Sequence, residues 1–265
     1  MYLEHFKFKR LPFQREIPIK DLFYSHQLKE GLARFLYVCN KRSLGVLCGG
    51  VGAGKSTLIR MLEDELDPKD YRFIYIADSK LTPKDFYTYA LRGLALEPPF
   101  RLNKAKHAFK KTVLDFYEHK NITCVFAIDE AQAMENSMLN EISFILNFKM
   151  DSFSPIAVIL IGQSEIKTML KGLPYQPILR RIEAFYSLEG MNENETKDYI
   201  EHQIKMAGAN RPVFPNDVIN KIYDYSKGVA SSINNLCNNS LLDAAAKKQD
   251  IVDMENLNRA VAEMF

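Results

Sequence analysis

Apolar positions follow two different patterns along the chain, one typical of strands and the other typical of helices. Five short runs have the length and the β-branched or aromatic content of buried strands, and they cover residues 44–48, 71–77, 124–128, 156–161 and 184–188. A helix-period pattern over residues 28–38 precedes the first run, and further helix-period patterns over residues 58–62, 102–120 and 136–150 lie between the runs. Strands that alternate with helices predict a parallel sheet with helices on both faces.

After residue 190 the strand pattern stops and only the helical period continues. Helix starts are predicted at Asn192 with Glu195 as its capping partner, at Asn216, at Ser231 or Ser232, and at Asp253. The chain is therefore α/β, a three-layer αβα core with a five-stranded parallel sheet and a C-terminal helical lid. The predicted boundaries are 1–43 for a helical lead-in, 44–189 for the core and 190–265 for the lid.

Composition limits the kinds of partner. The 265 residues carry 35 Lys and Arg against 33 Asp and Glu, a net charge of +2, so a surface for nucleic acid must be a local patch. The cysteines at 39, 48, 124 and 237 are far apart, which favours buried thiols in a reducing cytoplasm over disulfides or a zinc site.

Targeting signals are not evident in the sequence. The start at residues 1–5 lacks a basic segment followed by an apolar core, and no apolar run approaches the roughly 18 residues that span a bilayer. A soluble cytoplasmic protein without membrane contact is the expectation.

A glycine-rich loop between the first strand and the next helix carries the clearest chemistry. It reads Gly49-Gly50-Val51-Gly52-Ala53-Gly54-Lys55-Ser56-Thr57, a complete phosphate-binding loop in the context that the motif requires. Loop amides and the helix N-terminus can bind a polyphosphate, Lys55 can reach the β- and γ-phosphates, and Ser56 can ligate Mg²⁺. These residues predict a site for ATP with Mg²⁺.

Polar residues at other strand ends complete the predicted site. The strand at 124–128 is followed by Asp129, suited to hold Mg²⁺ through water, and by Glu130, suited to polarise the attacking water. Gln163 follows the next strand and can contact the γ-phosphate. Arg181, with Arg180 as the fallback, can reach the γ-phosphate of a neighbouring subunit or can form a surface ion pair.

The order of these features resembles the AAA+ ATPases. More narrowly, the chain resembles the ExeA-like family in the segments 1–6, 11–13, Asp129-Glu130-Ala131-Gln132, 161–165, and Gly228 with 232–236. That family contains secretion-pathway ATPases and the ATPase partners of DDE transposases. Secretion-pathway members carry a transmembrane segment and an envelope-binding extension; the chain shows neither, which favours the transposition regulators.

The resemblance implies specific roles and partners. Such regulators bind ATP and Mg²⁺, assemble as rings or helical filaments on duplex DNA, mark a target, and recruit or stimulate a transposase, with hydrolysis dismantling the assembly. Lys55, Glu130, Gln163 and Arg181 match the catalytic positions. The family's lid commonly has an arginine three residues after the glycine that matches Gly228, where this chain has Ser231, so hydrolysis is expected to be slow or partner-dependent.

Two groups of residues are candidates for the DNA surface. In related regulators the DNA-facing groups lie after the second strand, which corresponds here to Lys80, Thr82 and Lys84, with Thr82 as N-cap of the next helix. A second basic group, which can equally be a solvated helix face, comprises Lys104, Lys106, Lys110 and Lys111.

Two other functions remain open. One is a secretion or envelope-assembly ATPase that acts on protein partners, and the other is a scaffold that binds ATP without hydrolysing it. Aromatic residues near the start, Phe6, Phe8 and Phe13, favour core packing over a contact with the nucleotide base or the sheet edge.

Overall fold

A computed structural model describes residues 2–150, 152–209 and 211–264. Contacts within the chain group it into two compact units. The sheet unit comprises Glu30–Val51 and Lys55–Leu188, and the helical unit comprises Met1–Lys29, Gly52–Gly54 and Glu189–Phe265. Each unit has a hydrophobic core of its own, and each is described separately below.

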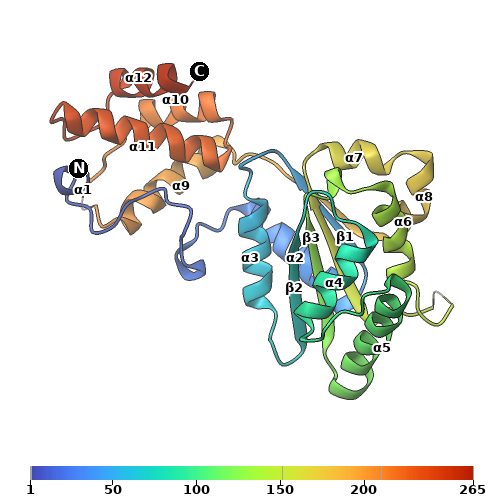
Figure 1. Ribbon diagram of the computed structural model, residues 1–265. Coiled ribbons are helices and arrows are strands. Elements are labelled where there is room, and N and C mark those ends of the chain that lie inside the picture. The colour runs from blue at the N-terminus through green and yellow to red at the C-terminus, as the bar shows by residue number, and fades with distance from the viewer. Residues whose placement is uncertain (1, 151, 210, 265) are drawn as a thin grey trace. The chain divides into compact units, whose positions relative to one another are not determined.

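The sheet unit contains five parallel strands in the order β2-β3-β4-β1-β5 (Figure 1). The strands are β1 (Leu44–Gly49), β2 (Tyr71–Ala77), β3 (Thr123–Asp129), β4 (Ile156–Gly162) and β5 (Ile182–Leu188). This arrangement confirms the predicted parallel sheet. Because β4 lies between β1 and β3, the carboxyl ends of these three strands meet at one edge, where the phosphate loop, Asp129 and Gln163 follow them.

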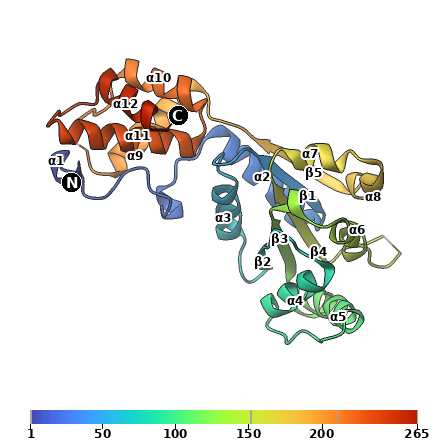
Figure 2. The ribbon, with the colours of Figure 1, turned by 45° about the horizontal axis from the view of Figure 1, so that its top comes forward.

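Helices cover both faces of this sheet, as Figure 2 shows. One face, where Gly45 lies against Phe35 and where Leu58 lies beside Gly31 and Tyr186, is covered by α2 (His26–Lys41) and α3 (Lys55–Glu65). The other face carries the larger core, which α4 (Pro83–Gly93), α5 (Leu102–Lys120), α6 (Asn136–Ile145), α7 (Glu165–Leu170) and α8 (Gln176–Leu179) cover. The layers are therefore αβα.

Two predicted boundaries in the sheet unit are wrong. The helix predicted over 136–150 ends at Ile145, because Phe148 forms a β-bridge with Phe153 and because Lys149 and Met150 adopt positive φ of 47° and 58°. The fifth strand begins at Ile182, two residues before the predicted start, because Ile182 already pairs with Leu44 of β1.

The helical unit joins the start of the chain to its end. Its helices are α1 (Tyr2–His5), α9 (Glu193–Met206), α10 (Asn216–Ser226), α11 (Ala230–Ala246) and α12 (Met254–Met264). Phe6, Phe8 and Phe13 are buried in the core of this unit, which confirms the predicted core packing. A capping box between Asn192 and Glu195 starts α9, as predicted.

The cysteine side chains lie in the interior of the two units. All four cysteines are free and buried, two of them in β1 and β3. Among the described residues, no helix is both long and apolar enough to cross a bilayer.

Candidate nucleotide site

The phosphate loop connects β1 to α3, as its sequence predicts. Gly52 and Gly54 have φ of 77° and 105°, values that favour glycine and turn the backbone amides of the loop. The Lys55 ammonium donates to the carbonyl oxygens of Gly49 at 2.8 Å and Gly50 at 2.9 Å. These two hydrogen bonds therefore hold the Lys55 side chain against the phosphate loop, where its ammonium can contact bound phosphates.

Two residues from other parts of the chain, Leu188 and Ser231, lie close to glycines of the loop. A Cβ on Gly49 would lie 2.5 Å from the Leu188 carbonyl oxygen of β5, so the pairing of β1 with β5 requires glycine there. Within the helical unit, to which Gly52–Gly54 belong, the Ser231 amide donates to the Gly52 carbonyl at 3.3 Å. Ser231, the residue at the lid-arginine position, thus contacts Gly52 of the same unit through its backbone.

Asp129 and Glu130 lie at the carboxyl end of β3. One oxygen of the Asp129 carboxylate accepts from the Glu130 amide at 2.8 Å, and the other accepts from the hydroxyl of Tyr75 on β2. Glu130 has left-handed backbone angles, φ 53° and ψ 34°, and its side chain is exposed. Asp129 is therefore held by two hydrogen bonds at the end of the strand, whereas Glu130 follows it in an exposed left-handed turn.

Tyr75 is a site residue that the sequence does not indicate. It lies two positions before Ala77, which pairs with Asp129, so a long side chain on this face of β2 reaches the carboxylate. Burial, the hydrogen bond to Asp129, and the negative charges of Asp129 and Glu130 all raise the pKa of the Tyr75 phenol. The phenol consequently remains a hydrogen-bond donor to Asp129 throughout the physiological pH range.

Gln132, in the short 3₁₀ turn Ala131–Ala133, links two of the predicted catalytic residues. Its amide nitrogen donates to the Glu130 carboxylate at 2.6 Å, and its amide oxygen accepts from the Gln163 backbone at 2.9 Å. Glu130 after β3 and Gln163 after β4 are therefore joined by one side chain.

The residues present fit Mg²⁺ and a polyphosphate. Ser56 offers a hydroxyl in the first turn of α3 and Asp129 offers a carboxylate, which are the oxygen donors that Mg²⁺ prefers. No group of three or more His, Cys, Asp or Glu able to hold a metal occurs among the described residues. In ATPases, Mg²⁺ usually has few protein ligands, and phosphates and water supply the remaining ligands.

The two candidate arginines differ in their surroundings. The Arg181 guanidinium is half-buried and donates to the Ser143 carbonyl of α6 at 2.6 Å. Arg180, one residue earlier, is exposed. Arg181 thus contributes to holding α6 in place, whereas Arg180 faces solvent.

The candidate DNA residues after β2 surround the start of α4. Lys80 and Lys84 are exposed, and the Lys84 ammonium lies 4.9 Å from the centroid of the Phe100 ring. Thr82 caps α4 as predicted, and its side chain and Asp85 form both hydrogen bonds of a capping box. The lysines are open to a phosphate, while the Thr82 hydroxyl is already engaged by a carboxylate.

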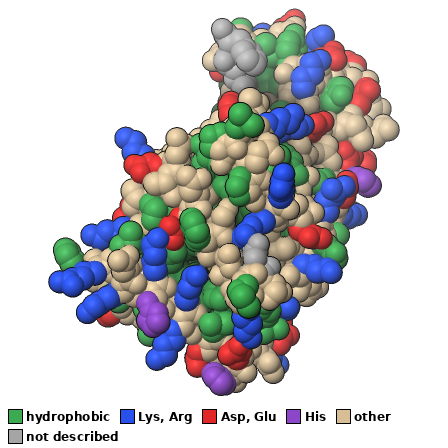
Figure 3. All heavy atoms as spheres, turned by 90° about the vertical axis from the view of Figure 1, so that its right-hand side faces the viewer, with side chains coloured by type: hydrophobic (Ala, Val, Ile, Leu, Met, Phe, Trp, Pro, Cys, Tyr) green, Lys and Arg blue, Asp and Glu red, His purple; other side chains and the backbone are tan. Residues whose placement is uncertain are grey.

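The second basic group lies on α5 and divides into two kinds of lysine. Lys104 and Lys111 are exposed, but Lys106 forms an ion pair of 2.7 Å with Glu141 of α6, and Lys110 lies 3.4 Å from the Asn147 carbonyl. Glu141 is buried and also accepts from the Tyr87 hydroxyl of α4 at 2.7 Å. Figure 3 shows basic side chains spread among acidic and hydrophobic ones.

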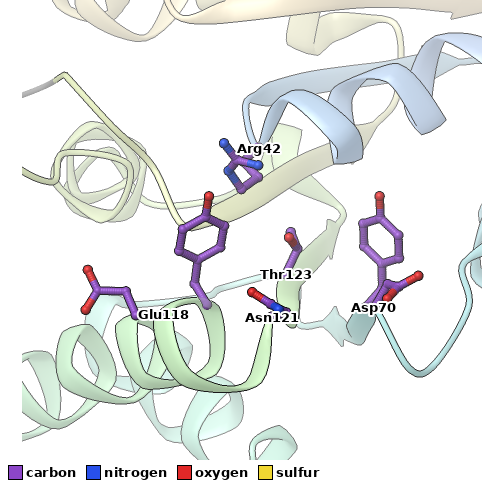
Figure 4. Close-up of a pocket in the computed structure, with 7 residues that line it drawn as sticks. Arg42, Asp70, Glu118, Asn121 and Thr123 are labelled. Atoms are coloured by element: carbon purple, nitrogen blue, oxygen red, sulfur yellow. The ribbon is translucent and has the colours of Figure 1, made fainter.

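A cavity of about 460 Å³ lies at the opposite edge of the sheet, where Tyr71 and Thr123 begin β2 and β3 (Figure 4). Arg42 lies over the Tyr117 ring at 4.9 Å and donates to the Ser154 carbonyl at 3.0 Å. None of the predicted site residues lines this cavity. The candidate site therefore lies at the carboxyl edge of the sheet, away from this cavity.

Comparison with known proteins indicates an AAA domain in this chain. A family model described as an AAA domain matches residues 39–170, which include the phosphate loop, Asp129, Glu130 and Gln163. General secretion pathway protein A from Aeromonas hydrophila is 28% identical over 259 residues, 93% of this chain and 45% of that protein. The chain thus spans less than half the length of this relative.

Solved structures with the same fold include a Cdc6 protein, an ORC protein and a RuvB motor. Cdc6p from Pyrobaculum aerophilum matches with a TM-score of 0.69 and 16% identity over 98% of this chain and 70% of its own. Aeropyrum pernix ORC1, solved in complex with DNA, has a TM-score of 0.66 and 16% identity, with coverages of 93% and 67%. The RuvB branch migration motor of Thermotoga maritima has a TM-score of 0.63 and 15% identity, over 94% of this chain and 72% of its own. The core of this protein has the P-loop AAA+ fold, and together the comparisons support an AAA+ ATPase.

Proposed function

We propose that this protein is an ATP-hydrolysing AAA+ regulator of DNA transposition, which assembles on duplex DNA, selects a target and recruits or stimulates a DDE transposase. The observation that most supports this proposal is that the phosphate loop, Asp129, Glu130 and Gln163 lie at one edge of the sheet. That arrangement supports hydrolysis. The DNA part rests on exposed lysines beside the same edge and on the resemblance to transposition regulators.

Each residue of this edge has a role in the proposed reaction. Bound Mg²⁺ neutralises charge on the ATP phosphates. The amides of residues 49–57 and Lys55 hold the phosphates, and Ser56 and Asp129 hold the metal. Glu130 orients the attacking water and takes its proton, while Gln163 contacts the γ-phosphate. Arg181, or Arg180 in its place, stabilises charge at the neighbouring subunit's site, a contribution of about 10³ to 10⁵ in rate.

Lys80 and Lys84 are the proposed contacts to DNA. Both are exposed and precede or begin α4, where ammonium groups can bind phosphates without reading bases. Lys104 and Lys111 are secondary contacts on α5, while Thr82, Lys106 and Lys110 contribute less because their polar groups have partners within the fold. Repetition of these contacts along an oligomer gives binding that is sequence-tolerant and salt-dependent.

Sedimentation velocity tests the assembly directly. The protein is run with duplex DNA and Mg²⁺ in the presence of ATP, ADP or a slowly hydrolysed ATP analogue. The proposal predicts oligomers on the duplex with ATP or the analogue, their loss with ADP, and greater persistence for Glu130→Gln in ATP because hydrolysis dismantles the assembly. A monomer in every nucleotide state contradicts the proposal.

A second candidate, an ATPase that acts on protein partners in secretion or envelope assembly, is favoured by the similarity to General secretion pathway protein A. It shares the nucleotide chemistry but requires no DNA contact. Nucleotide-dependent assembly without DNA, unaffected by charge reversal at Lys80 and Lys84, favours this candidate. A third, a scaffold that binds ATP without hydrolysis, is supported if wild-type turnover equals that of Glu130→Gln.

A further inference from the structure

Gln132 uses both ends of its side-chain amide within the candidate site. The nitrogen donates to Glu130 Oε2 at 2.6 Å, and the oxygen accepts from the backbone N–H of Gln163 at 2.9 Å. A carboxylate can only accept and a backbone N–H can only donate, so these two partners allow one orientation of the amide. The chemistry of the partners thus confirms the direction of both hydrogen bonds.

The end of β4 is shaped to receive this side chain. Gly162 is the last residue of β4, and a Cβ built on it would lie 2.7 Å from Gln132 Oε1 and 3.4 Å from the Gln132 backbone nitrogen. Any other residue at position 162 would push Gln132 from its place. The glycine therefore leaves room for the bond between Gln132 and Gln163.

Glu130 needs such support because little else restrains its side chain. The residue is exposed, and its backbone occupies the left-handed region at φ 53°, where a side chain is rarely favoured. The hydrogen bond from Gln132 favours one position of the carboxylate. The same amide is bonded to the backbone of Gln163, directly after β4, and so sets the position of the Glu130 carboxylate relative to the end of that strand.

We propose that Gln132 is a positioning residue for ATP hydrolysis, which holds the water-activating carboxylate of Glu130 in register with the γ-phosphate contact at Gln163. The inference rests on the proposed ATPase activity. Gln132 does not contact the reacting atoms; it acts through Glu130. Misplacement of a catalytic group by about 1 Å can cost about 100-fold in rate, so loss of Gln132 lowers turnover while leaving the phosphate-binding groups intact.

Steady-state turnover and ATP-analogue binding distinguish this role from a structural one. For Gln132→Met, which keeps the length and loses both hydrogen bonds, we expect kcat to fall about 10- to 100-fold. The Kd of a fluorescent ATP analogue is expected to stay within about 2-fold, which also reports that the variant is folded. Gln132→Asn, which is too short for both partners, serves as a second variant, and exposed Gln14→Met is the matched control.

Two double variants test the pathway of the effect. Since Gln132 acts through Glu130, adding Gln132→Met to Glu130→Gln is expected to lower kcat no further. Gly162→Ala alone is expected to lower kcat, because its methyl group displaces the amide, but to add nothing in a Gln132→Ala background. Additive losses in both cycles overturn the proposed role.

The outcome also separates this inference from the function on which it rests. Wild-type turnover no higher than that of Glu130→Gln overturns the hydrolysis proposal and this role together. Clear wild-type turnover with an undiminished kcat for Gln132→Met overturns the positioning role alone. A fall in kcat with unchanged analogue binding and with non-additive cycles supports both.

Discussion

The hydroxyl of Tyr75 donates to the carboxylate of Asp129 across the neighbouring strands β2 and β3. The other Asp129 oxygen accepts from the Glu130 amide at 2.8 Å, so both oxygens of the carboxylate are oriented by the protein. Hydrogen bonds of this kind fix the direction in which a carboxylate presents its remaining lone pairs. Tyr75 thus connects the edge strand β2 with the proposed Mg²⁺ ligand.

Replacing Tyr75 by Phe is expected to weaken Mg²⁺ binding. Loss of an outer-shell hydrogen bond typically costs about 10- to 100-fold in metal affinity, so the Mg²⁺ concentration for half-maximal turnover should rise about 10-fold. Tyr75 is 47% exposed, and the free energy of unfolding should change by less than about 1 kcal/mol. Tyr89→Phe, which removes a hydroxyl bound to Asp78, is the matched control. An unchanged Mg²⁺ dependence would show that Asp129 needs no orientation by Tyr75.

Lys106 is expected to stabilise the fold more than it binds DNA. Its replacement by Met leaves the buried Glu141 carboxylate without its ion pair, which should lower the free energy of unfolding by about 2 kcal/mol in urea denaturation. The exposed Lys104→Met and Lys111→Met variants should change it by less than about 0.5 kcal/mol. Equal effects of the three substitutions would argue against the structural role of Lys106.

Mixing variants tests whether an arginine acts between subunits. Arg181→Ala keeps an intact set of site residues, and Glu130→Gln keeps its arginines, so each variant alone should be nearly inactive in turnover. An equimolar mixture should recover part of the activity, because some Arg181→Ala sites then face an arginine of the other variant. The same experiment with Arg180→Ala identifies the acting residue, since Arg181 is also bound to Ser143. No recovery with either arginine variant would contradict action in trans.

Thiol reactivity reports the packing of both units. Burial raises the pKa of Cys39 and Cys124 to about 12, above the ordinary value near 8.5 for an exposed thiol. The folded state therefore holds these protons more tightly, and the stability this contributes is present below about pH 8.5 and is lost as pH rises toward 12. At pH 8 the four cysteines should react with a thiol reagent only after denaturation. Rapid reaction of the native protein would contradict their burial.

Features encoded by neighbouring residues could be predicted from the sequence, and features that depend on distant partners could not. The strand at 71–77 and the capping box of Thr82 and Asp85 agree with the structure because composition and spacing determine them locally. The end of α6 depends on the pairing of Phe148 with Phe153 after the helix, which no helical period reveals.

The same distinction applies to the candidate site. The phosphate loop, Asp129, Glu130 and Gln163 are recognisable because each directly follows an apolar strand. The contact of Tyr75 with Asp129 depends on the register between β2 and β3. Likewise, the partner of Lys106 lies 35 residues away on another helix, and the positive charges of α5 alone cannot distinguish a lysine paired within the fold from one open to DNA.

Binding of labelled duplex DNA, followed by fluorescence anisotropy, tests the central claim most directly. Wild type and Lys80→Glu/Lys84→Glu are compared with ATP, ADP and a slowly hydrolysed analogue at two salt concentrations. The double variant of Lys120 and Lys149, both changed to Glu on exposed positions elsewhere in the sheet unit, controls for net charge.

The account predicts binding that requires ATP or the analogue, falls steeply with salt, and is lost in Lys80→Glu/Lys84→Glu but largely kept in the control. Several phosphate contacts per subunit produce this salt dependence, because each contact releases counterions from the duplex. Absence of DNA binding in every nucleotide state would contradict the account and would direct attention to a protein client of the same ATPase core.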